Sequence, residues 1–322
     1  MAYDFIAIGD TVVDDFIKLK DAQVNCDINN ENCTITMRFA DKIPFESSTV
    51  VYGVGNAANA AVSAARLGLK TAFVSNVGKD ENGEKILKYF KTQKVETKYV
   101  KKNPGFKTNY HYVLSYDADR TILVKHEAYP YEFPKDLPPP KTLYLSSLGA
   151  GTEAYHDAIA AYAEAHPSMF LVFQPGTFQM QMGIEKLMRV YKRANMLVLN
   201  KEEAQRVLKI KEEDIEKLAR ALQAHGPRVV IITDGPNGVY ALEGDAFFHT
   251  PMFPDLKPPV NRTGAGDALA STTAAYLTMG LPLKDAIKRG TVNSAYVVQG
   301  VGAQMGLLKK DDLEKALSES GK

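Results

Sequence analysis

The chain has 322 residues, of which 39 are Lys or Arg and 38 are Asp or Glu, so its formal net charge is +1 at pH 7. Such balanced charge, with 45% hydrophobic and 24% charged residues, gives no electrostatic footprint for nucleic acid or an anionic membrane. No apolar run approaches the roughly 20 residues that span a bilayer, and no secretory signal pattern opens the chain. We therefore expect a cytoplasmic protein without nucleic-acid or membrane partners, built as one large α/β domain or two small domains.

The N-terminal part begins with a short buried strand and then becomes polar. Residues 3–8 are rich in Ile, Phe and Ala and stop at Gly9, which is typical of such a strand. Residues 16–51 are β-like, with an Asn-rich turn at 29–32. The only two cysteines, Cys26 and Cys33, lie in this part; they are near enough in sequence to pair, but we expect two reduced thiols.

The remaining elements follow in a regular order. A small-residue helix over 56–67 is closed by Gly68, and a strand over 71–75 and an amphipathic helix over 82–92 come next. Residues 108–116 and 121–125 alternate in polarity around the turn Asp117-Ala-Asp-Arg120 and predict a hairpin. After a proline-rich connector, strands at 142–145, 169–173, 196–199 and 229–233 alternate with helices at 155–165, 183–192 and 201–222. This alternation predicts a parallel sheet with helices on both faces, and Asp10, Asn200 and Thr233 follow strand ends, where the active sites of such sheets lie.

The stretch Asn261-Arg-Thr-Gly-Ala-Gly-Asp267 precedes an apolar helix. The first turn of a helix carries unpaired N–H groups and the positive end of the helix dipole, so it binds anions. Gly264, Ala265 and Gly266 leave these groups open to a ligand. From the residues alone, Asp267 is either a base for a hydroxyl beside that anion or a simple helix cap.

Five motifs in register resemble the ribokinase-like (PfkB) carbohydrate and nucleoside kinases. They are Ile6-Ala-Ile-Gly-Asp10-Thr-Val-Val-Asp14, Gly53-Val-Gly55-Asn56-Ala-Ala-Asn59, Asn200-Lys-Glu-Glu203, Thr233-Asp-Gly235-Pro-Asn-Gly238 and Thr263-Gly-Ala-Gly-Asp267. The resemblance implies an α/β, three-layer αβα fold with a central, mostly parallel sheet. It also implies one kinase domain over 1–322, with a small β-sheet lid from segments at approximately 16–51 and 106–127.

The same resemblance assigns roles to single residues. Asp267 would be the base, with the backbone of Gly264, Ala265 and Gly266 as the anion hole. The substrate would contact Asp14, Gly55, Asn56 and Asn59. The nucleotide would contact Asn200, Thr233, Gly235, Gly238 and Asn293, and Glu203 would serve Mg²⁺ through water. Arg120 lies between two expected lid strands. It is either an exposed turn residue or a contact to a substrate hydroxyl or phosphate.

Three departures from the family pattern matter. Asn261 stands where relatives activated by a monovalent cation carry Asp, which argues against potassium activation. Val54-Gly55 stands where the family has a glycine pair, so the Val54 side chain leaves less room for the substrate. Gln174-Pro-Gly-Thr177 replaces an Asp-x-Asn-x-Arg motif, which argues against fructokinase-like and ketodeoxygluconate-kinase-like specificities.

We therefore expect an ATP- and Mg²⁺-dependent kinase that phosphorylates a hydroxymethyl group of a small sugar, in the manner of ribokinase and fructokinase. The alternative is a nucleoside kinase with the same mechanism, in which Phe106, Tyr110 and Tyr112 of the lid stack on a base. A nucleotide-dependent oxidoreductase is disfavoured because no Gly-x-Gly-x-x-Gly follows the first strand. A P-loop kinase is disfavoured because no Gly-x-x-x-x-Gly-Lys-Ser/Thr occurs. The exposed lid strands predict a homodimer formed through the lid.

Overall fold

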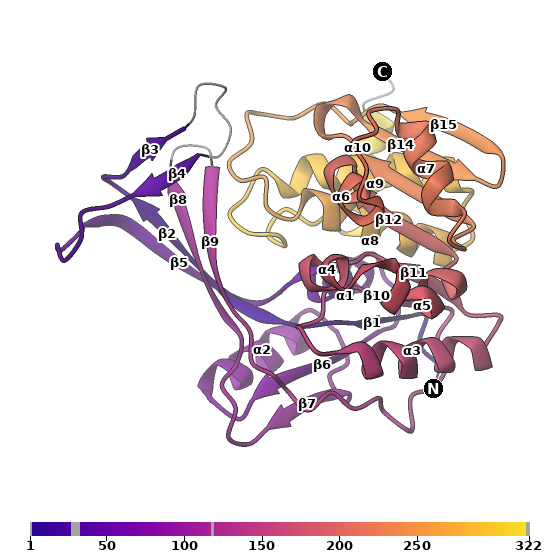
Figure 1. Ribbon diagram of the computed structural model, residues 1–322, viewed down its shortest axis with the longest axis horizontal. Helices are drawn as coiled ribbons and strands as arrows, with labels where there is room; N and C mark the ends of the chain where they lie inside the picture. Colours follow the sequence, from indigo (N-terminus) through magenta and orange to yellow (C-terminus); the bar gives the residue numbers. More distant parts are fainter. Residues whose placement is uncertain (1, 27–32, 117–118, 320–322) are drawn as a thin grey trace.

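The main sheet has nine strands in the order β15-β14-β13-β12-β11-β10-β1-β6-β7, with helices on both of its faces (Figure 1). The computed structural model describes residues 2–26, 33–116 and 119–319. All neighbouring strands from β7 to β13 run parallel, and β14 and β15 add antiparallel at one edge. The strands are β1 (Phe5–Ile8), β6 (Thr71–Gly78), β7 (Val100–Asn103), β10 (Thr142–Leu145), β11 (Phe170–Phe173), β12 (Met196–Asn200), β13 (Val229–Thr233), β14 (Val239–Glu243) and β15 (Ala246–Thr250).

Alternate residues of the central strands pack into two hydrophobic cores, one on each face of the sheet. In β1, Phe5 and Ala7 join one core, whereas Ile6 and Ile8 join the other. The first core is covered by α1 (Asn56–Arg66), α2 (Glu81–Thr92), α8 (Ala265–Thr278), α9 (Leu283–Val297) and α10 (Lys310–Glu319). The second is covered by α3 (Glu153–Ala165), α4 (Thr177–Lys186), α5 (Met188–Arg193), α6 (Lys201–Leu208) and α7 (Ile215–Gln223). The expected three-layer αβα fold is therefore confirmed.

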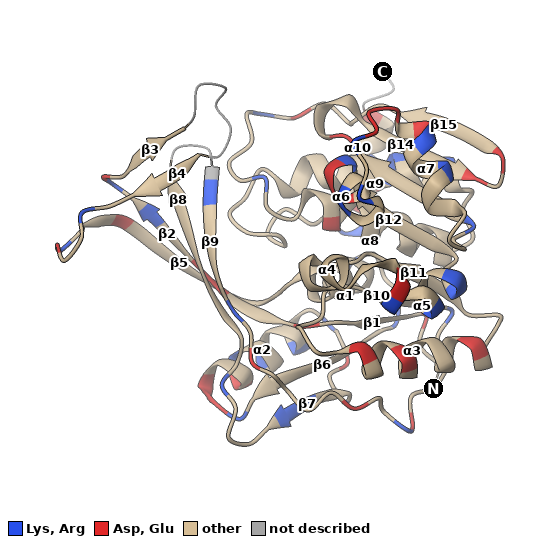
Figure 2. Cartoon of the chain, in the orientation of Figure 1, with Lys and Arg blue, Asp and Glu red and all other residues tan. Residues whose placement is uncertain are grey.

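Charged residues follow this layering. The strands β1, β10 and β11 carry none, because both of their faces are buried, whereas Lys, Arg, Asp and Glu are found on the outer helices, the loops, the lid and the edge strand β7 (Figure 2).

A second sheet projects from the main body and forms the lid (Figure 1). Its four strands run in the order β5-β2-β8-β9, and a separate two-stranded sheet, β3 and β4, extends it. The strands are β2 (Val12–Leu19), β3 (Gln23–Asn25), β4 (Thr34–Thr36), β5 (Phe45–Val54), β8 (Tyr110–Tyr116) and β9 (Asp119–Lys125). The predicted hairpin is confirmed as β8 and β9, although positions 117 and 118 of its turn lie outside the described residues.

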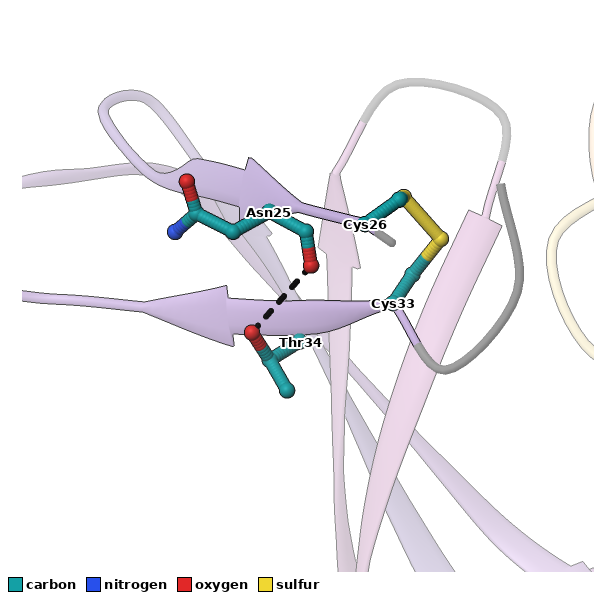
Figure 3. Close-up of a disulfide and its surroundings, with 4 residues drawn as sticks. All are labelled: Asn25, Cys26, Cys33 and Thr34. Carbon is teal, nitrogen blue, oxygen red and sulfur yellow. Dashed lines mark hydrogen bonds between the residues drawn. A yellow bond between two sulfur atoms is a disulfide. The ribbon is translucent and has the colours of Figure 1, made fainter. Parts of the chain in front are cut away.

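Cys26 and Cys33 form a disulfide next to β3 and β4, so the expectation of two reduced thiols is wrong (Figure 3). The cause is the antiparallel pairing of Asn25 with Thr34, which brings the Cα atoms of the two cysteines to 4.0 Å. Thr34 Oγ1 also donates a hydrogen bond of 3.2 Å to the carbonyl oxygen of Asn25. The predicted Asn-rich turn at 29–32 lies outside the described residues. The cysteines therefore give no support to a reducing compartment.

Two predicted helices are interrupted. The helix expected over 201–222 is two helices, α6 and α7, because Lys209 adopts a left-handed conformation with φ of 56°. The helix expected over 183–192 is likewise divided, because α4 ends at Lys186 and α5 begins at Met188, and Gly183 itself is non-helical, with φ of 81°. None of the helices in the described ranges has the length and apolarity needed to cross a membrane.

Candidate active site

A cavity of about 300 Å³ lies where the carboxyl ends of β12 and β13 meet the N-terminus of α8. This is the edge of a parallel sheet at which ligands bind in α/β folds. The lid contributes to its wall as well. Its lining residues are Asn56, Arg120, Gln174, Val198, Leu199, Asn200, Glu203, Thr233, Arg262, Thr263, Gly264, Ala265, Gly266 and Asp267.

The carboxylate of Asp267 is held by three side-chain amides. Asn59 Nδ2 donates to Oδ2 at 2.7 Å, while Asn56 Nδ2 and Gln174 Nε2 donate to Oδ1 at 3.0 and 2.9 Å. Asn56 and Asn59 reach Asp267 because α1 packs beside α8, where the hydroxyls of Ser63 and Thr272 also meet at 3.4 Å. The carboxylate therefore has a fixed orientation in the cavity.

The electrostatic environment of Asp267 is of the kind that suits a proton acceptor. The residue is only 9% exposed, and burial raises the pKa of its carboxyl group above the ordinary value. The amide hydrogen bonds from Asn59, Gln174 and Asn56 act in the opposite direction, because they stabilise the ionised form. A carboxylate with a raised pKa binds a proton more strongly than an ordinary aspartate, as a general base requires.

The N-terminus of α8 is open toward the same cavity. The helix begins at Ala265 with Gly264 as its N-cap, and no described side chain caps its amides. Gly264 has φ of 85°, and a Cβ there would lie 2.4 Å from the Cβ of Ala303, so glycine is required for the turn and for packing. A Cβ at Gly266 would meet no atom within 4 Å. The backbone N–H groups at this end can therefore donate hydrogen bonds to an anion next to Asp267.

Asn200 and Glu203 form a capping box at the start of α6. Asn200 Oδ1 accepts from the Glu203 amide at 2.7 Å, and Glu203 Oε2 accepts from the Asn200 amide at 2.9 Å. Burial, followed by the negative charge of Asp267, raises the pKa of the Glu203 carboxyl group, although the Asn200 amide counteracts this. Both residues line the cavity, so the helix cap also brings a carboxylate toward Asp267.

Of the predicted substrate residues, Asn56 and Asn59 contact Asp267, whereas Asp14 and Gly55 are not among the residues that line the cavity. Asp14 is in β2, and its Oδ1 is buried without a hydrogen-bond partner among the described residues. The Nδ1 atom of His111 is 3.3 Å away, which makes a charge contact but not an aligned hydrogen bond. Gly55 precedes α1 with φ of 113°, and a Cβ there would lie 2.8 Å from the carbonyl oxygen of Asp10. Gly55 therefore has a packing role in addition to any contact with substrate.

The predicted nucleotide residues are only partly brought together. Thr233 lines the cavity at the end of β13, whereas Gly235 and Gly238 lie in the following turn, outside the cavity wall. Asn293 is fully buried in α9. Its Nδ2 donates to Thr272 Oγ1 at 2.7 Å, and its Oδ1 accepts from the Leu308 amide at 2.9 Å. Asn293 thus links α8, α9 and the following loop, and its predicted place in the adenine pocket has no support from these contacts.

For three cavity residues, the sequence predicted no place in the site or only a minor one. Gln174 attracted notice only as a departure from a family motif, and nothing in its neighbourhood pointed to Asp267. Arg120 is exposed, as expected, but it belongs to β9 and lines the cavity. Arg262 lies inside the signature at 261–267 and was assigned no role. Both arginines therefore line the same cavity as the N-terminus of α8.

Comparisons with known proteins agree with this geometry. The profile of the pfkB family carbohydrate kinases matches residues 21–310. Fructokinase of Klebsiella pneumoniae is 26% identical over 282 residues, covering 82% of this chain and 91% of the relative. Ribokinase of Bacillus subtilis strain 168 is 28% identical over 275 residues, covering 82% and 87%.

A solved structure shows the same fold. Ribokinase of Arabidopsis thaliana complexed with ribose and ATP superposes with a TM-score of 0.80 at 18% identity, over 98% of this chain and 99% of that one. The predicted family resemblance is confirmed, because the family match spans most of the chain and the neighbours share its sheet and lid. The chain belongs to the pfkB family of carbohydrate kinases and has their ribokinase-like fold.

Proposed function

We propose that this kinase transfers the γ-phosphoryl group of ATP to a hydroxymethyl group of a free sugar, with Asp267 as the base. The observation that carries this proposal is one cavity that holds both a buried carboxylate with a raised pKa and the open N-terminus of α8. A base and an anion site in contact are the two parts that phosphoryl transfer to an alcohol requires.

The hydrogen bonds of Asp267 identify its basic oxygen. A carboxylate offers about four lone-pair directions, two on each oxygen. Oδ1 already accepts from Asn56 and Gln174, whereas Oδ2 accepts only from Asn59. Oδ2 therefore has the free direction. It takes the proton of the sugar hydroxyl as the hydroxyl oxygen forms its bond to the γ-phosphorus and the bond to the ADP oxygen breaks.

The negative charge of the transferring group faces the backbone amides of residues 264–266 and the positive helix end. Such preorganised donors stabilise charge that develops in the transition state. Arg120 from the lid and Arg262 beside Gly264 add two cations to the same wall. Because Arg120 is on β9, closure of the lid completes the charge environment only when the acceptor is covered.

Magnesium would be served by Asn200 and Glu203. Mg²⁺ keeps several waters and contacts few carboxylates, so the one carboxylate of Glu203 at the cavity wall fits an indirect role. When bound, the ion neutralises charge on the phosphates of ATP. The Asn261 Oδ1 atom accepts a 2.8 Å hydrogen bond from the Thr263 amide, and we propose that this uncharged side chain supports no potassium activation.

The lid contacts favour a sugar over a nucleoside. Tyr110 and Tyr112 pack against each other with ring centroids 5.0 Å apart, and Phe106 packs against Tyr129 at 5.7 Å. Tyr110 and Tyr112 border a separate hollow, not the cavity of Asp267. The aromatic side chains that would stack on a base are thus engaged elsewhere.

We further propose that two lids pair in a homodimer. The three consecutive residues Ile122, Leu123 and Val124 of β9 are 40%, 52% and 56% exposed, so both faces of this edge strand present apolar side chains to solvent. Exposed apolar edge strands are ready partners for a second strand.

The test is ADP release from ATP and magnesium over a panel of free sugars and ribonucleosides. The proposal predicts a signal with at least one free sugar and little ADP release without an acceptor. A signal confined to nucleosides would replace the sugar by the alternative acceptor class. Silence over the panel, with ATP binding intact, would contradict the proposed kinase activity.

A further inference from the structure

Gln304 lies outside every motif that the sequence indicated, yet two hydrogen bonds connect it to the proposed base. Its Nε2 donates to Asn59 Oδ1 at 2.7 Å, and Asn59 Nδ2 donates to Asp267 Oδ2 at 2.7 Å. The hydroxyl of Tyr89 donates to Gln304 Oε1 at 2.6 Å. We propose that Gln304 is a positioning residue that holds the Asn59 amide with its N–H toward Asp267, an inference that rests on the proposed function.

The direction of these hydrogen bonds is fixed at both ends of the set Tyr89, Gln304, Asn59 and Asp267, here called the Gln304 network. A backbone carbonyl oxygen and a carboxylate only accept hydrogen bonds. Gln304 Nε2 also donates to the carbonyl oxygen of Gly53 at 2.8 Å, so this end of the Gln304 amide must carry the N–H groups. Its two N–H groups are then used by Gly53 and by Asn59 Oδ1. Asn59 therefore turns its own N–H end toward Asp267.

The network is buried, so water competes little with its hydrogen bonds. Gln304, Asn59 and Asp267 are 2%, 4% and 9% exposed. Burial raises the pKa of the Tyr89 phenol, against the opposing charge of Arg66, so the phenol stays protonated and donates at neutral pH. A buried amide that loses a partner costs free energy, and each member of the network therefore keeps the next in one orientation.

The loop that carries Gln304 is held close to the proposed active site. It joins α9 to α10, and the Arg66 guanidinium at the end of α1 donates to the carbonyl oxygens of Gln304 and Leu307, at 2.6 and 2.9 Å. The neighbouring Ala303 lies so close to Gly264 that a Cβ on the glycine would be 2.4 Å from the Cβ of Ala303. The same loop thus contacts the turn before α8 and, through Gln304, a hydrogen-bond partner of the base.

Asn59 makes the shortest of the three amide hydrogen bonds to Asp267. Its bond reaches Oδ2, the oxygen proposed to take the proton, and Oδ2 has no other donor among the described residues. Burial raises the pKa of the Asp267 carboxyl group, and the strongest of the hydrogen bonds that lower it is the one from Asn59. Without Gln304, the Asn59 amide loses the partner of its oxygen and can rotate. Its hydrogen bond to Asp267 then weakens.

The other titratable and charged groups around Asp267 do not replace this contact. Glu203 lies at the cavity wall and adds negative charge, and the buried phenol of Tyr144 is neutral because burial raises its pKa. Arg120 and Arg262 line the cavity without an ion pair to Asp267 in the described part of the chain. The pKa of the base therefore depends on its amide donors, and the weakening of one of them is measurable.

The first experiment measures the pKa of Asp267 from the pH dependence of the aspartate carboxyl ¹³C signals, in the enzyme without substrate. Asp267→Asn removes one signal and thereby assigns it. Gln304→Met keeps the size of the side chain but donates no hydrogen bond. We expect it to raise the pKa of Asp267 by about half a unit, a part of the effect of one hydrogen bond to a charged group. An unchanged Asp267 pKa in the folded Gln304→Met protein would overturn the inference.

Two milder variants accompany this measurement. Tyr89→Phe frees the Gln304 amide without removing it, so it should raise the pKa of Asp267 by a smaller amount. Ser63→Ala is the matched control, because it removes a buried polar contact between α1 and α8, to Thr272, that does not belong to the network. Its Asp267 pKa should equal that of the wild type. A shift as large as that of Gln304→Met would show that looser packing, and not the amide, sets the pKa.

A double substitution tests whether Gln304 acts through Asn59. In Asn59→Leu the amide that Gln304 holds is absent. Adding Gln304→Met to this variant should therefore leave the pKa of Asp267 where Asn59→Leu alone puts it. A further rise as large as in the wild-type background would mean that Gln304 acts by another route, which contradicts the proposed positioning.

The kinetic experiment follows kcat/KM against pH for the wild type and Gln304→Met with the best sugar acceptor. Asp267 must be ionised to act, so a raised pKa moves the acidic limb to higher pH by about half a unit and changes the plateau at high pH little. A merely structural defect would lower kcat/KM by the same factor at every pH, and this result would refute the positioning role. If no acceptor yields ADP, the proposed function fails, and the NMR titration alone decides the role of Gln304.

Discussion

Gln174 Nε2 donates a 2.9 Å hydrogen bond to Oδ1 of Asp267, although 93 residues separate them in sequence. The Oε1 atom of the same amide accepts from the buried phenol of Tyr144 in β10. The orientation of the amide is therefore fixed, with its N–H groups toward Asp267. Through Gln174, the loop after β11 helps to set both the orientation and the pKa of the proposed base.

Replacing Gln174 by Met should shift the pH dependence of catalysis. Asp267 must be ionised to act, so kcat/KM rises with pH through the pKa of this carboxyl group. Burial already raises that pKa, and the Gln174 hydrogen bond lowers it, so its loss raises the pKa further. We expect the acidic limb of the kcat/KM profile to move to higher pH by about one unit, as for one hydrogen bond to a charged group.

Tyr144→Phe probes the same contact one step removed. It takes away the bond that fixes the Gln174 amide but leaves Gln174 Nε2 able to reach Asp267. The acidic limb should therefore move in the same direction as in Gln174→Met, by a smaller amount. An unchanged limb in Gln174→Met would show that this amide does not tune the base.

Alanine substitutions at the two glycines of the proposed anion site should have different effects, one on stability and the other on activity. Gly264→Ala places a Cβ against Ala303 at a positive φ, so we expect a loss of stability of about 1–3 kcal/mol. Gly266→Ala meets no protein atom and lies within α8, where Ala gains up to about 1 kcal/mol over Gly. The Gly266 variant should nevertheless lose activity, because its methyl group enters the space of the phosphoryl group.

Unfolding midpoints and kcat of both variants give the test. A Gly266→Ala enzyme with full kcat would exclude the backbone at this position from the anion hole.

Arg120 belongs to lid strand β9 and lines the cavity that holds Asp267. Substituting Gln for Arg120 removes a cation from the cavity wall, and we expect kcat to fall about 100-fold, as for loss of one transition-state donor. Arg120→Lys should retain part of the rate, because the charge remains but the planar fork is lost. Arg38→Gln is the matched control, since Arg38 is an exposed lid arginine paired with Asp41. Equal kcat in the two Gln variants would contradict a catalytic role for Arg120.

The lid edge should determine the oligomeric state. Leu123→Glu places a charge on an exposed apolar strand, so the proposed dimer should dissociate to a monomer. Light scattering coupled to size-exclusion chromatography measures the mass directly. Ile210→Glu, at a 43% exposed position outside the lid, should leave the mass unchanged. A monomeric wild type at micromolar concentration would refute the proposal.

Much of the fold was predictable because it depends on local patterns. The buried strands β1, β11, β12 and β13 are short apolar runs, and their alternation with helices indicates a parallel sheet. The divisions at Lys209 and Leu187 were missed, because no glycine or proline marks them in the sequence. The disulfide was missed because it depends on the register of β3 with β4.

The candidate site was predictable only where its residues are consecutive in the sequence. Residues 264–267, which hold the proposed anion site and the proposed base, lie within one turn, so a short motif carries them. Gln174 reaches Asp267 through a contact between distant segments, which a single sequence does not reveal. For Asn293 the family position did not disclose that its side-chain amide is hydrogen-bonded to Thr272 and to the Leu308 backbone.

The most direct test of the account is the single-turnover rate of Asp267→Asn with the best sugar acceptor and saturating ATP and magnesium. Asn keeps the size of the side chain but cannot take the hydroxyl proton, so the account predicts a rate at least about 100-fold below wild type, with ATP binding and unfolding midpoint retained. A folded, ATP-binding Asp267→Asn enzyme that phosphorylates the sugar at the wild-type rate would contradict the assignment of Asp267 as the base.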